Sequence, residues 1–226
     1  MSVLFIAGSG TDIGKTYVAV RLIESLRANG RRVVALKPVA SGVAPIEDQA
    51  FADSDAARLL RAQDLPLNAA AVAACSPWRF AAPLSPDMAA AAEGRKLLLN
   101  ELVAFVYASI ASSPGALIVI EGVGGVMSPI CCDATNLDLI VALRCPTLLV
   151  AGSYLGAISH ALTAIEALKA RAAPIAALLV NETEGSCVAL DATIDSLSRF
   201  SSGVMLAPMR RNEERIPDAV LRMFGK

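Results

Sequence analysis

Aromatic residues and histidine are scarce in this chain of 226 residues. Phe, Trp and Tyr together make up 4% of it and there is one histidine, whereas hydrophobic residues as a whole make up 55%. With so little aromatic volume, the core has to be built from Ala, Val, Leu and Ile, as expected for buried parallel strands covered by Ala-rich helices. The length suits one α/β domain, residues 1–226, with a substantial core.

Neither sign of charge dominates the sequence. It has 20 Lys and Arg against 21 Asp and Glu, a formal net charge of −1. Because nucleic-acid binding calls for a basic surface, we expect no nucleic-acid partner. The basic cluster of Arg210, Arg211 and Arg215 is interleaved with Glu213 and Glu214, which is typical of a solvated face.

Paired cysteines and long apolar runs are also lacking. The five cysteines include no Cys-x-x-Cys pair, and the adjacent Cys131 and Cys132 do not make a metal site, which favours reduced thiols in a cytoplasmic protein. The N-terminus has no basic region and only a short apolar run, so we expect no signal peptide. The uncharged stretch Cys145–Ile165 contains Pro146, Gly152 and Gly156 and therefore predicts a strand, a loop and a helix start, with no association with a membrane.

Short apolar runs alternate with helical patterns, which predicts a doubly wound parallel sheet with ligands at the carboxyl ends of its strands. The expected strands are Val3–Ala7, Val33–Lys37, Leu117–Glu121, Thr147–Ala151, Ile175–Val180 and Val204–Ala207. The expected helices are Lys15–Asn29, which Gly30 ends through a left-handed cap, and Ser54–Ala62, Pro86–Ala92, Leu97–Ser112, Leu137–Leu143, Ala157–Arg171 and Val188–Arg199. Between them, the Ala-rich Ala69–Ala74 and three prolines up to Pro86 indicate an irregular segment, either a lid or a dimer contact.

A glycine-rich turn follows the first apolar run. Residues 8–16 read Gly-Ser-Gly-Thr-Asp-Ile-Gly-Lys-Thr, with five residues between Gly8 and Gly14 where four are usual. A strand that ends in such a turn and restarts as a helix is typical of a phosphate-binding loop, because backbone N–H groups and the helix dipole hold the anion. Lys15 would reach the β- and γ-phosphates and the Thr16 hydroxyl would bind Mg²⁺. The alternative is a purely structural turn.

Two acidic residues are candidates to complete a magnesium site. Glu121 ends an apolar run and precedes Gly122-Val123-Gly124-Gly125, which is the position of a Walker-B-type ligand, although a simple strand-end charge is the alternative. Asp53 and Asp55 flank Ser54 at the start of a helix, and either aspartate can cap it. Asp55 can instead join Thr16 and Glu121 as a ligand of a hard cation.

Lys37 ends the second apolar run and leads into Pro38-Val39-Ala40-Ser41-Gly42. At the carboxyl end of a strand, its ammonium is expected in the same crevice as Lys15, where two lysines can neutralise a triphosphate and a further anion. Ser41 offers a hydroxyl nearby. Taken alone, a lysine at a strand end is more often a surface charge.

Together these motifs resemble those of the dethiobiotin synthetases of biotin biosynthesis. The motifs run in the family's order over about residues 3–208: Gly14-Lys15-Thr16, Lys37 to Gly42, Ser54-Asp55-Ala56, Pro83 to Pro86, Glu93-Gly94, Glu121 to Gly125, Leu155 to His160 and Val180-Asn181. The resemblance implies a P-loop NTPase fold and a cytoplasmic homodimer with shared active sites. It also implies the reaction of 7,8-diaminononanoate with CO₂ and ATP to give dethiobiotin, ADP and phosphate.

The resemblance further implies roles for individual residues. Lys37 would contact the carbamate and the transferring phosphoryl group, and Lys15 and Thr11 would act beside it. Ser41 would bind the diamine, whose carboxylate would be received by Gly156, Ala157, Ile158 and Ser159 of the partner subunit. Mg²⁺ would be held by Thr16, Asp55 and Glu121. The nucleotide site would comprise Asp12, Ile13, Gly14, Lys15, Thr16, Tyr17, Asp55, Glu121, Gly122, Val123, Gly124, Asn181, which reads adenine, and Pro208, which packs against the base.

This chain departs from the family's commoner residues at Gly10, Asp12 and Ser159. His160, the single histidine, is expected just inside a helix, where structural packing is favoured over a role as general base. Two other classes share the loop. A regulatory or partitioning ATPase usually has an extra lysine near Gly8, and a catalytically silent module is expected to lack Lys37 or the metal ligands. An amidotransferase relative would need a glutaminase domain, for which this sequence leaves no room.

Overall fold

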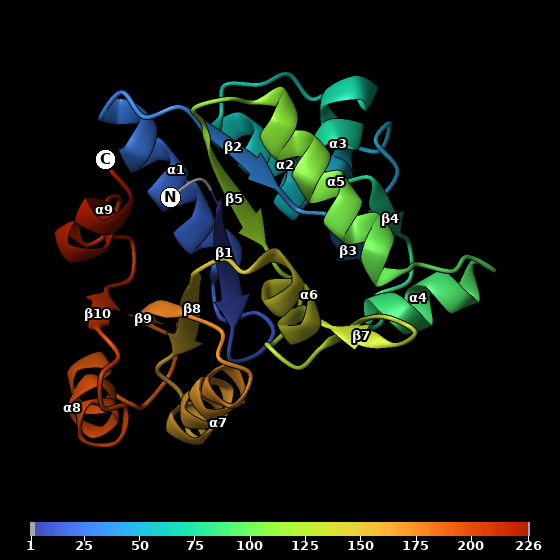
Figure 1. Cartoon of the computed structure of the whole chain (residues 1–226). Helices are drawn as coiled ribbons and strands as arrows, with labels where there is room; N and C mark the ends of the chain where they lie inside the picture. Colours follow the sequence, from blue (N-terminus) through green and yellow to red (C-terminus); the bar gives the residue numbers. More distant parts are fainter. Residues whose placement is uncertain (1–2, 226) are drawn as a thin grey trace.

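The computed structural model describes residues 3–225, and within them a six-stranded parallel sheet forms the centre of the molecule (Figure 1). Its strand order is β10-β9-β8-β1-β5-β2. The strands are β1 (Val3–Gly8), β2 (Val33–Leu36), β5 (Leu117–Glu121), β8 (Thr147–Gly152), β9 (Ile175–Asn181) and β10 (Leu206–Met209). The prediction of a doubly wound α/β sheet is confirmed.

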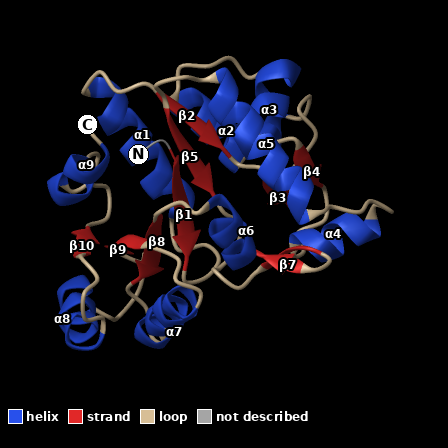
Figure 2. Cartoon of the chain, viewed as in Figure 1, coloured by secondary structure: helices blue, strands red, loops and turns tan. Residues whose placement is uncertain are grey.

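Both faces of this sheet are covered by helices (Figure 2). Leu4 and Ile6 of β1 pack toward one face and Phe5 and Ala7 toward the other, and none of the four is more than 2% exposed. Burial on both sides explains why these strands are continuous apolar runs without alternation. The first face is covered by α1 (Lys15–Ala28), α2 (Asp55–Ala62), α3 (Ala69–Cys75) and α9 (Asp218–Phe224). The second is covered by α5 (Leu99–Ser112), α6 (Asn136–Leu143), α7 (Ala157–Ala170) and α8 (Leu190–Phe200).

The ends of the predicted elements agree with the structure to within two residues. Differences of two residues occur at the starts of α5, α8 and β10. Strand β10 begins at Leu206 and not at Val204, because Val204 belongs to a turn in which its N–H donates to Ser201 O after Gly203, whose φ is +79°. Gly30, with φ +77°, follows the first helix as expected.

The segment predicted to be irregular contains α3 and the short strand β4 (Trp78–Phe80), which pairs in parallel with β3 (Val39–Ser41). Helix α4 (Pro86–Ala92) follows it as predicted. Other small elements that the sequence did not predict are the 3-10 helix η1 (Gln49–Asp53), the antiparallel pair β6 (Pro129–Cys131) and β7 (Ala134–Thr135), and α9.

The topology brings several chain segments to one edge of the sheet. Strand β2 follows β1 in the sequence but lies beyond β5 on one side of β1 in the sheet. Strand β8 lies on the other side of β1. In α/β proteins, ligands bind at the carboxyl ends of the strands beside such a switch of direction. No helix among residues 3–225 is long and apolar enough to span a membrane. All five cysteines lie in this range and are free thiols.

Candidate active site

The glycine-rich loop connects β1 to α1 at the carboxyl edge of the sheet. Gly14, with φ +91°, is the residue immediately before α1, and a Cβ at this position would lie 2.2 Å from Nδ2 of Asn181. The same Nδ2 donates to Ile13 O at 3.1 Å. The last residue of β9 is therefore fastened to the loop, and only glycine satisfies both the backbone conformation and the close contact.

Lys15 is 7% exposed, and its Nζ donates to Gly10 O at 2.8 Å. Burial and the nearby ammonium of Lys37 lower the pKa of Lys15 to about 8. Both causes disfavour the charged form of Lys15, whose positive charge the protein alone compensates poorly. A polyanion bound beside Lys15 would supply that compensation and would itself be stabilised by the ammonium.

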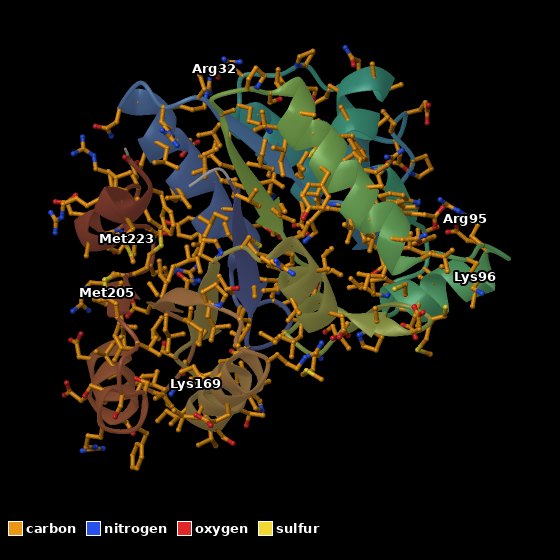
Figure 3. The ribbon with its side chains drawn as sticks, viewed as in Figure 1. Arg32, Arg95, Lys96, Lys169, Met205 and Met223 are labelled. Atoms are coloured by element: carbon orange, nitrogen blue, oxygen red, sulfur yellow. The ribbon has the colours of Figure 1, made fainter. Side chains whose placement is uncertain are left out.

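Lys37 lies at the junction of three segments that are distant in sequence. It follows β2 directly and is 2% exposed, unlike the exposed Arg95, Lys96 and Lys169 at the surface in Figure 3. Its Nζ lies 2.6 Å from Glu121 Oε1 and 2.9 Å from Asp55 Oδ2. Burial alone would disfavour the ammonium, but the two carboxylates outweigh it and raise the pKa of Lys37. The surface-charge interpretation of this lysine is wrong.

Three oxygen-bearing side chains converge beside Lys37. Thr16 Oγ1 lies 2.7 Å from both Asp55 Oδ1 and Glu121 Oε1. One hydroxyl proton cannot serve two carboxylates, and Glu121 Oε2 is buried with no hydrogen-bond partner among the described residues. This all-oxygen set fits Mg²⁺, which takes few protein ligands and completes its shell with phosphate and water. Residues 3–225 hold no cluster of three or more His, Cys, Asp or Glu side chains that could hold a metal ion.

Of the two interpretations of Asp53 and Asp55, the one in which an aspartate caps α2 is wrong. Ser54 caps the helix by accepting a hydrogen bond from Ala57 N–H at 3.2 Å, and neither Asp53 nor Asp55 does so. Asp55 is instead the first helical residue and faces Lys37, which holds the pKa of Asp55 below its ordinary value even though burial opposes this.

The remaining predicted loop residues lie at the surface of the loop. Thr11 and Asp12 are exposed, and Thr11 Oγ1 would lie 3.6 Å from a Cβ at Gly124. A hollow of about 460 Å³ lies next to them, bounded by residues 9–11, residues 125–129 and the side of α7. Ser41 ends β3 and is half-buried. Within residues 3–225, Thr16, Lys37, Asp55 and Glu121 thus form one contact network, whereas Lys15 hydrogen-bonds to Gly10 O and Ser41 makes no hydrogen bond to the network.

The N-terminus of α7 lies at the surface. Gly156 precedes its first residue and no side chain caps the helix, so the amides of its first turn have no side-chain partner. Leu155 is 88% exposed and Ser159 is exposed, whereas the side chain of Ala157 is fully buried. His160 is also exposed, and its Nδ1 hydrogen-bonds the Tyr154 hydroxyl at 2.8 Å. His160 lies just inside α7, as expected, and its ring packs against that of Tyr154.

Asn181 and Pro208 lie on neighbouring strands, with Met209 in register with Asn181. Residues 210–214, here called the strap, follow β10. Tyr17 OH donates to Glu213 O, which joins the first turn of α1 to the strap. Exposed Arg210 and Arg211 pair with Asp191 and Glu184 at 2.9 and 2.7 Å, as expected for a solvated face.

The sequence did not single out two features of this edge. Asn136, at the start of α6, is buried against the glycine loop that follows Glu121, but an asparagine before an apolar helix reads as an ordinary helix start. The contact between Tyr17 and Glu213 joins residues 196 positions apart, and no local pattern announces it.

A phosphate-binding loop on the first strand of a parallel sheet, with lysine, hydroxyl and carboxylates at adjoining segments, defines the chain as a P-loop protein of the α/β class. A family model described as "AAA domain" matches residues 2–215. ATP-dependent dethiobiotin synthetases BioD are similar over nearly the full chain. The one from Methylobacterium nodulans is 54% identical over 93% of this chain and 94% of its own length, and that from Caulobacter vibrioides is 47% identical over 94% of each. The chain belongs to the dethiobiotin synthetase family.

Solved structures agree with the fold. The MinC:MinD complex of Aquifex aeolicus matches with a TM-score of 0.55 over 98% of this chain and 86% of that chain. A ParA family ATPase from Chlorobium tepidum matches with a TM-score of 0.54 over 98% and 87%. Both are 12% identical, so they establish the architecture and do not favour a partitioning function for this chain.

Proposed function

We propose that this chain catalyses the reaction of 7,8-diaminononanoate with CO₂ and ATP to give dethiobiotin, ADP and phosphate. The observation that carries the proposal is the buried ammonium of Lys37, held between Glu121 and Asp55 next to the phosphate-binding loop. A chain that only bound nucleotide would need Lys15 and Thr16 but not a second buried lysine. Membership of the dethiobiotin synthetase family supports the choice of this reaction.

The chemistry gathers negative charge at each step. One substrate amine adds to CO₂ and loses a proton to form a carbamate. A carbamate oxygen then attacks the γ-phosphorus of ATP, releasing ADP and leaving a carbamic-phosphoric anhydride. The second amine attacks the anhydride carbonyl, expels phosphate and closes the ureido ring. Preorganised cations favour such steps because the charge they meet is greatest in the transition state.

Lys37 and Lys15 supply these cations. We assign Lys37 to the carbamate and the transferring phosphoryl group, because the two carboxylates keep it protonated. Lys15 bridges phosphates from within the loop, and Thr11 contacts the reacting groups from the exposed side. Thr16, Asp55 and Glu121 would hold Mg²⁺, which neutralises phosphate charge when bound.

Substrate and base are bound by residues around this centre. Ser41 hydrogen-bonds the carbamate or ureido group. In a homodimer, the first-turn amides of the partner's α7 receive the diamine's carboxylate, since backbone N–H groups at a helix N-terminus bind an anion without an arginine. The backbone of Gly122–Gly124 lies beside the phosphates. Asn181 Nδ2 is committed to Ile13 O, so its Oδ1 remains to accept from the adenine amino group, with Pro208 against the base. The free thiols fit a cytoplasmic location.

The test is ADP formation by the purified chain. ADP should appear only when the diamine, bicarbonate and Mg-ATP are all present, with dethiobiotin formed in equal amount. ADP formation independent of the diamine would favour a plain ATPase, and binding of ATP without any turnover would favour the silent module.

A further inference from the structure

The glycine loop that follows Glu121 is fastened to the start of α6 by one side chain. Nδ2 of Asn136 donates to Val123 O at 2.6 Å and to Gly125 O at 2.8 Å. The backbone N–H of Asn136 donates to Ser128 O at 3.1 Å. A single amide thus spans the two carbonyls of the loop, using both of its hydrogen-bond donors.

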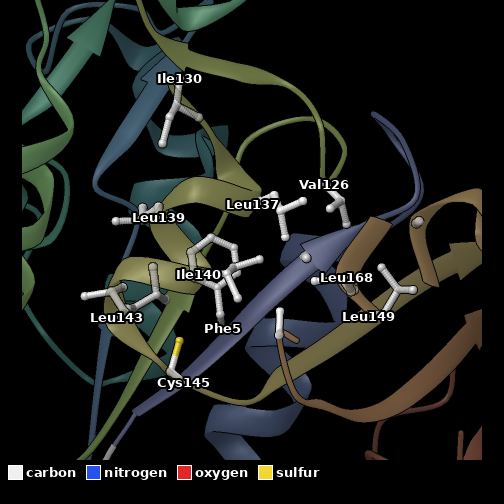
Figure 4. Packing of buried hydrophobic residues seen from close by; sticks show 14 of the residues in the cluster. Phe5, Val126, Ile130, Leu137, Leu139, Ile140, Leu143, Cys145, Leu149 and Leu168 are labelled. Atoms are coloured by element: carbon white, nitrogen blue, oxygen red, sulfur yellow. The ribbon is translucent and has the colours of Figure 1, made fainter. Parts of the chain in front are cut away.

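Asn136 is itself held in place by the packing of α6. It is 2% exposed, and the residues after it pack on the central strand. Figure 4 shows Leu137, Ile140 and Leu143 of α6 gathered around Phe5 of β1, and all belong to one buried cluster. The N-terminus of α6 is therefore a fixed point relative to β1, against which a flexible glycine loop can be aligned.

The loop in turn contacts Lys37. Gly122 O accepts a hydrogen bond from Lys37 Nζ at 3.0 Å. A Cβ at Gly122 would lie 2.8 Å from Phe5 Cε1 and 3.1 Å from Asn136 Oδ1, so the loop is pressed between β1 and α6 at this residue. Any release of the loop from Asn136 moves a direct partner of Lys37 and the residue next to Glu121.

Oδ1 of Asn136 has no hydrogen-bond partner among residues 3–225 and is buried. An unpaired buried carbonyl is costly, and an apolar side chain of similar size would avoid that cost. Helix formation does not require it either, because Thr135 caps α6. The reason for an amide side chain at this position is therefore its two N–H donors, which bind the two loop carbonyls.

We propose that Asn136 is a positioning residue, which fixes the Gly122–Gly125 loop and thereby holds the Gly122 carbonyl and the Glu121 carboxylate on Lys37. It touches no reacting group and acts through the loop. The inference rests on the proposed function, in which Lys37 meets the carbamate.

Asn136→Asp keeps the shape of the side chain and removes both donors, and Asn136→Ala removes them without adding charge. With the loop released, kcat should fall on the order of tenfold or more, as expected for loss of two buried hydrogen bonds near the site. KM for ATP should stay within about threefold, since the phosphate-binding loop keeps its own contacts. Amide hydrogen exchange of residues 122–126 should become faster.

Thr135→Ala is the matched control. Thr135 Oγ1 donates to Asp138 Oδ2 at 2.8 Å and accepts from Asp138 N–H, so its loss weakens the same helix without touching the loop. This variant should lower Tm, as the Asn136 variants do, and leave kcat and the loop exchange unchanged.

Equal loss of kcat in Thr135→Ala, or kcat within twofold of wild type in Asn136→Asp and Asn136→Ala, would overturn the proposal. So would variants that fail to fold, since Asn136 would then maintain the fold as a whole. If the wild type forms no ADP that depends on diamine and bicarbonate, the proposed function fails. The exchange comparison then still decides whether Asn136 holds the loop.

Discussion

Lys37 has two roles, in stability and in the proposed catalysis, and a substitution affects both. It is the only cation within 3 Å of either Glu121 or Asp55 among the described residues, so it balances the buried carboxylate of Glu121 and the partly exposed carboxylate of Asp55. Removing one partner of a buried ion pair is destabilising by about 3–5 kcal/mol, because the remaining charge is left uncompensated. Any kinetic study of this residue therefore has to measure folding as well.

We expect Lys37→Gln to lower kcat at least about a hundredfold, in line with loss of a preorganised charge contact. The dissociation constant of a non-hydrolysable ATP analogue should change much less. Tm should fall, and millimolar Mg²⁺ should raise it more in the variant than in wild type, because a cation then replaces the ammonium between the carboxylates. Lys169→Gln, which removes an exposed lysine, is the control for each measurement. Loss of ATP affinity with kcat preserved would make Lys37 a nucleotide-binding residue only.

Lys15 gives a pH-dependent signature of nucleotide binding. Its pKa is lowered to about 8 by burial and by Lys37, and an adjacent triphosphate favours the charged form and raises that pKa. Above pH 8 the lysine is mostly neutral in the free protein, so ATP binding should take up a proton there. At pH 6.5 the lysine is already charged and uptake should vanish. Calorimetry in buffers of different ionisation enthalpy measures this.

Lys15→Arg is the control for proton uptake, because arginine stays charged throughout this pH range. Uptake of the same size in Lys15→Arg at pH 8.5 would assign the proton to another group. Absence of uptake in the wild type would contradict the lowered pKa.

At the scale of elements, we propose that the strap, which follows Pro208, and the first turn of α1 together border the adenine base. The Tyr17 hydroxyl holds the strap at Glu213 O. One such hydrogen bond contributes about 1 kcal/mol, so Tyr17→Phe should raise KM for ATP on the order of fivefold and leave kcat unchanged. Tyr107→Phe, at an exposed tyrosine of α5, is the matched control. An unchanged KM in Tyr17→Phe would exclude the strap from nucleotide binding.

The elements that the sequence predicted well are those buried on both faces. Short, continuous apolar runs such as Leu117–Glu121 predict a central strand. The glycine-rich or acidic residues at their ends predict the position of the active site. Three-residue strands such as β3 and β4 depend on each other across 39 residues and leave no periodic signal. Helix α3 buries only Val72 and Cys75, so its Ala-rich sequence has no apolar stripe to predict it.

The same limit applies to the site. Thr16, Asp55 and Glu121 were predicted because each belongs to a local motif. That Thr16 Oγ1 lies 2.7 Å from both carboxylates depends on contacts across 39 and 105 residues, which the fold alone determines. The role inferred for Asn136 could not be predicted without the path of the loop that its side chain contacts. The exposure of His160 could not be predicted without the orientation of α7.

At the scale of the whole molecule, several large apolar side chains are exposed, including Leu155 at 88%, Met127 at 56% and Met88 at 55%. Leu155 directly precedes the helix start assigned to the substrate carboxylate of another subunit. A partner subunit at this end of α7 would cover apolar surface and bring the first-turn amides to a second active site.

Subunit mixing tests the shared site. Ser159→Glu places a carboxylate at the exposed start of α7, whereas the buried Ala157 would not tolerate one. We expect this variant to raise KM for the diamine by repulsion of its carboxylate and to leave ATP binding unchanged. Mixed with Lys37→Gln, whose defect is in kcat, and assayed at a diamine concentration well below the raised KM, it should form dimers with one intact site and one doubly altered site. Random exchange at equal amounts should then restore about a quarter of wild-type activity, because half of the dimers are mixed and each has one working site. Mass spectrometry of the mixture establishes that exchange has occurred. Exchanged dimers without recovered activity, or a fully active monomer in sedimentation, would place the carboxylate site within a single chain.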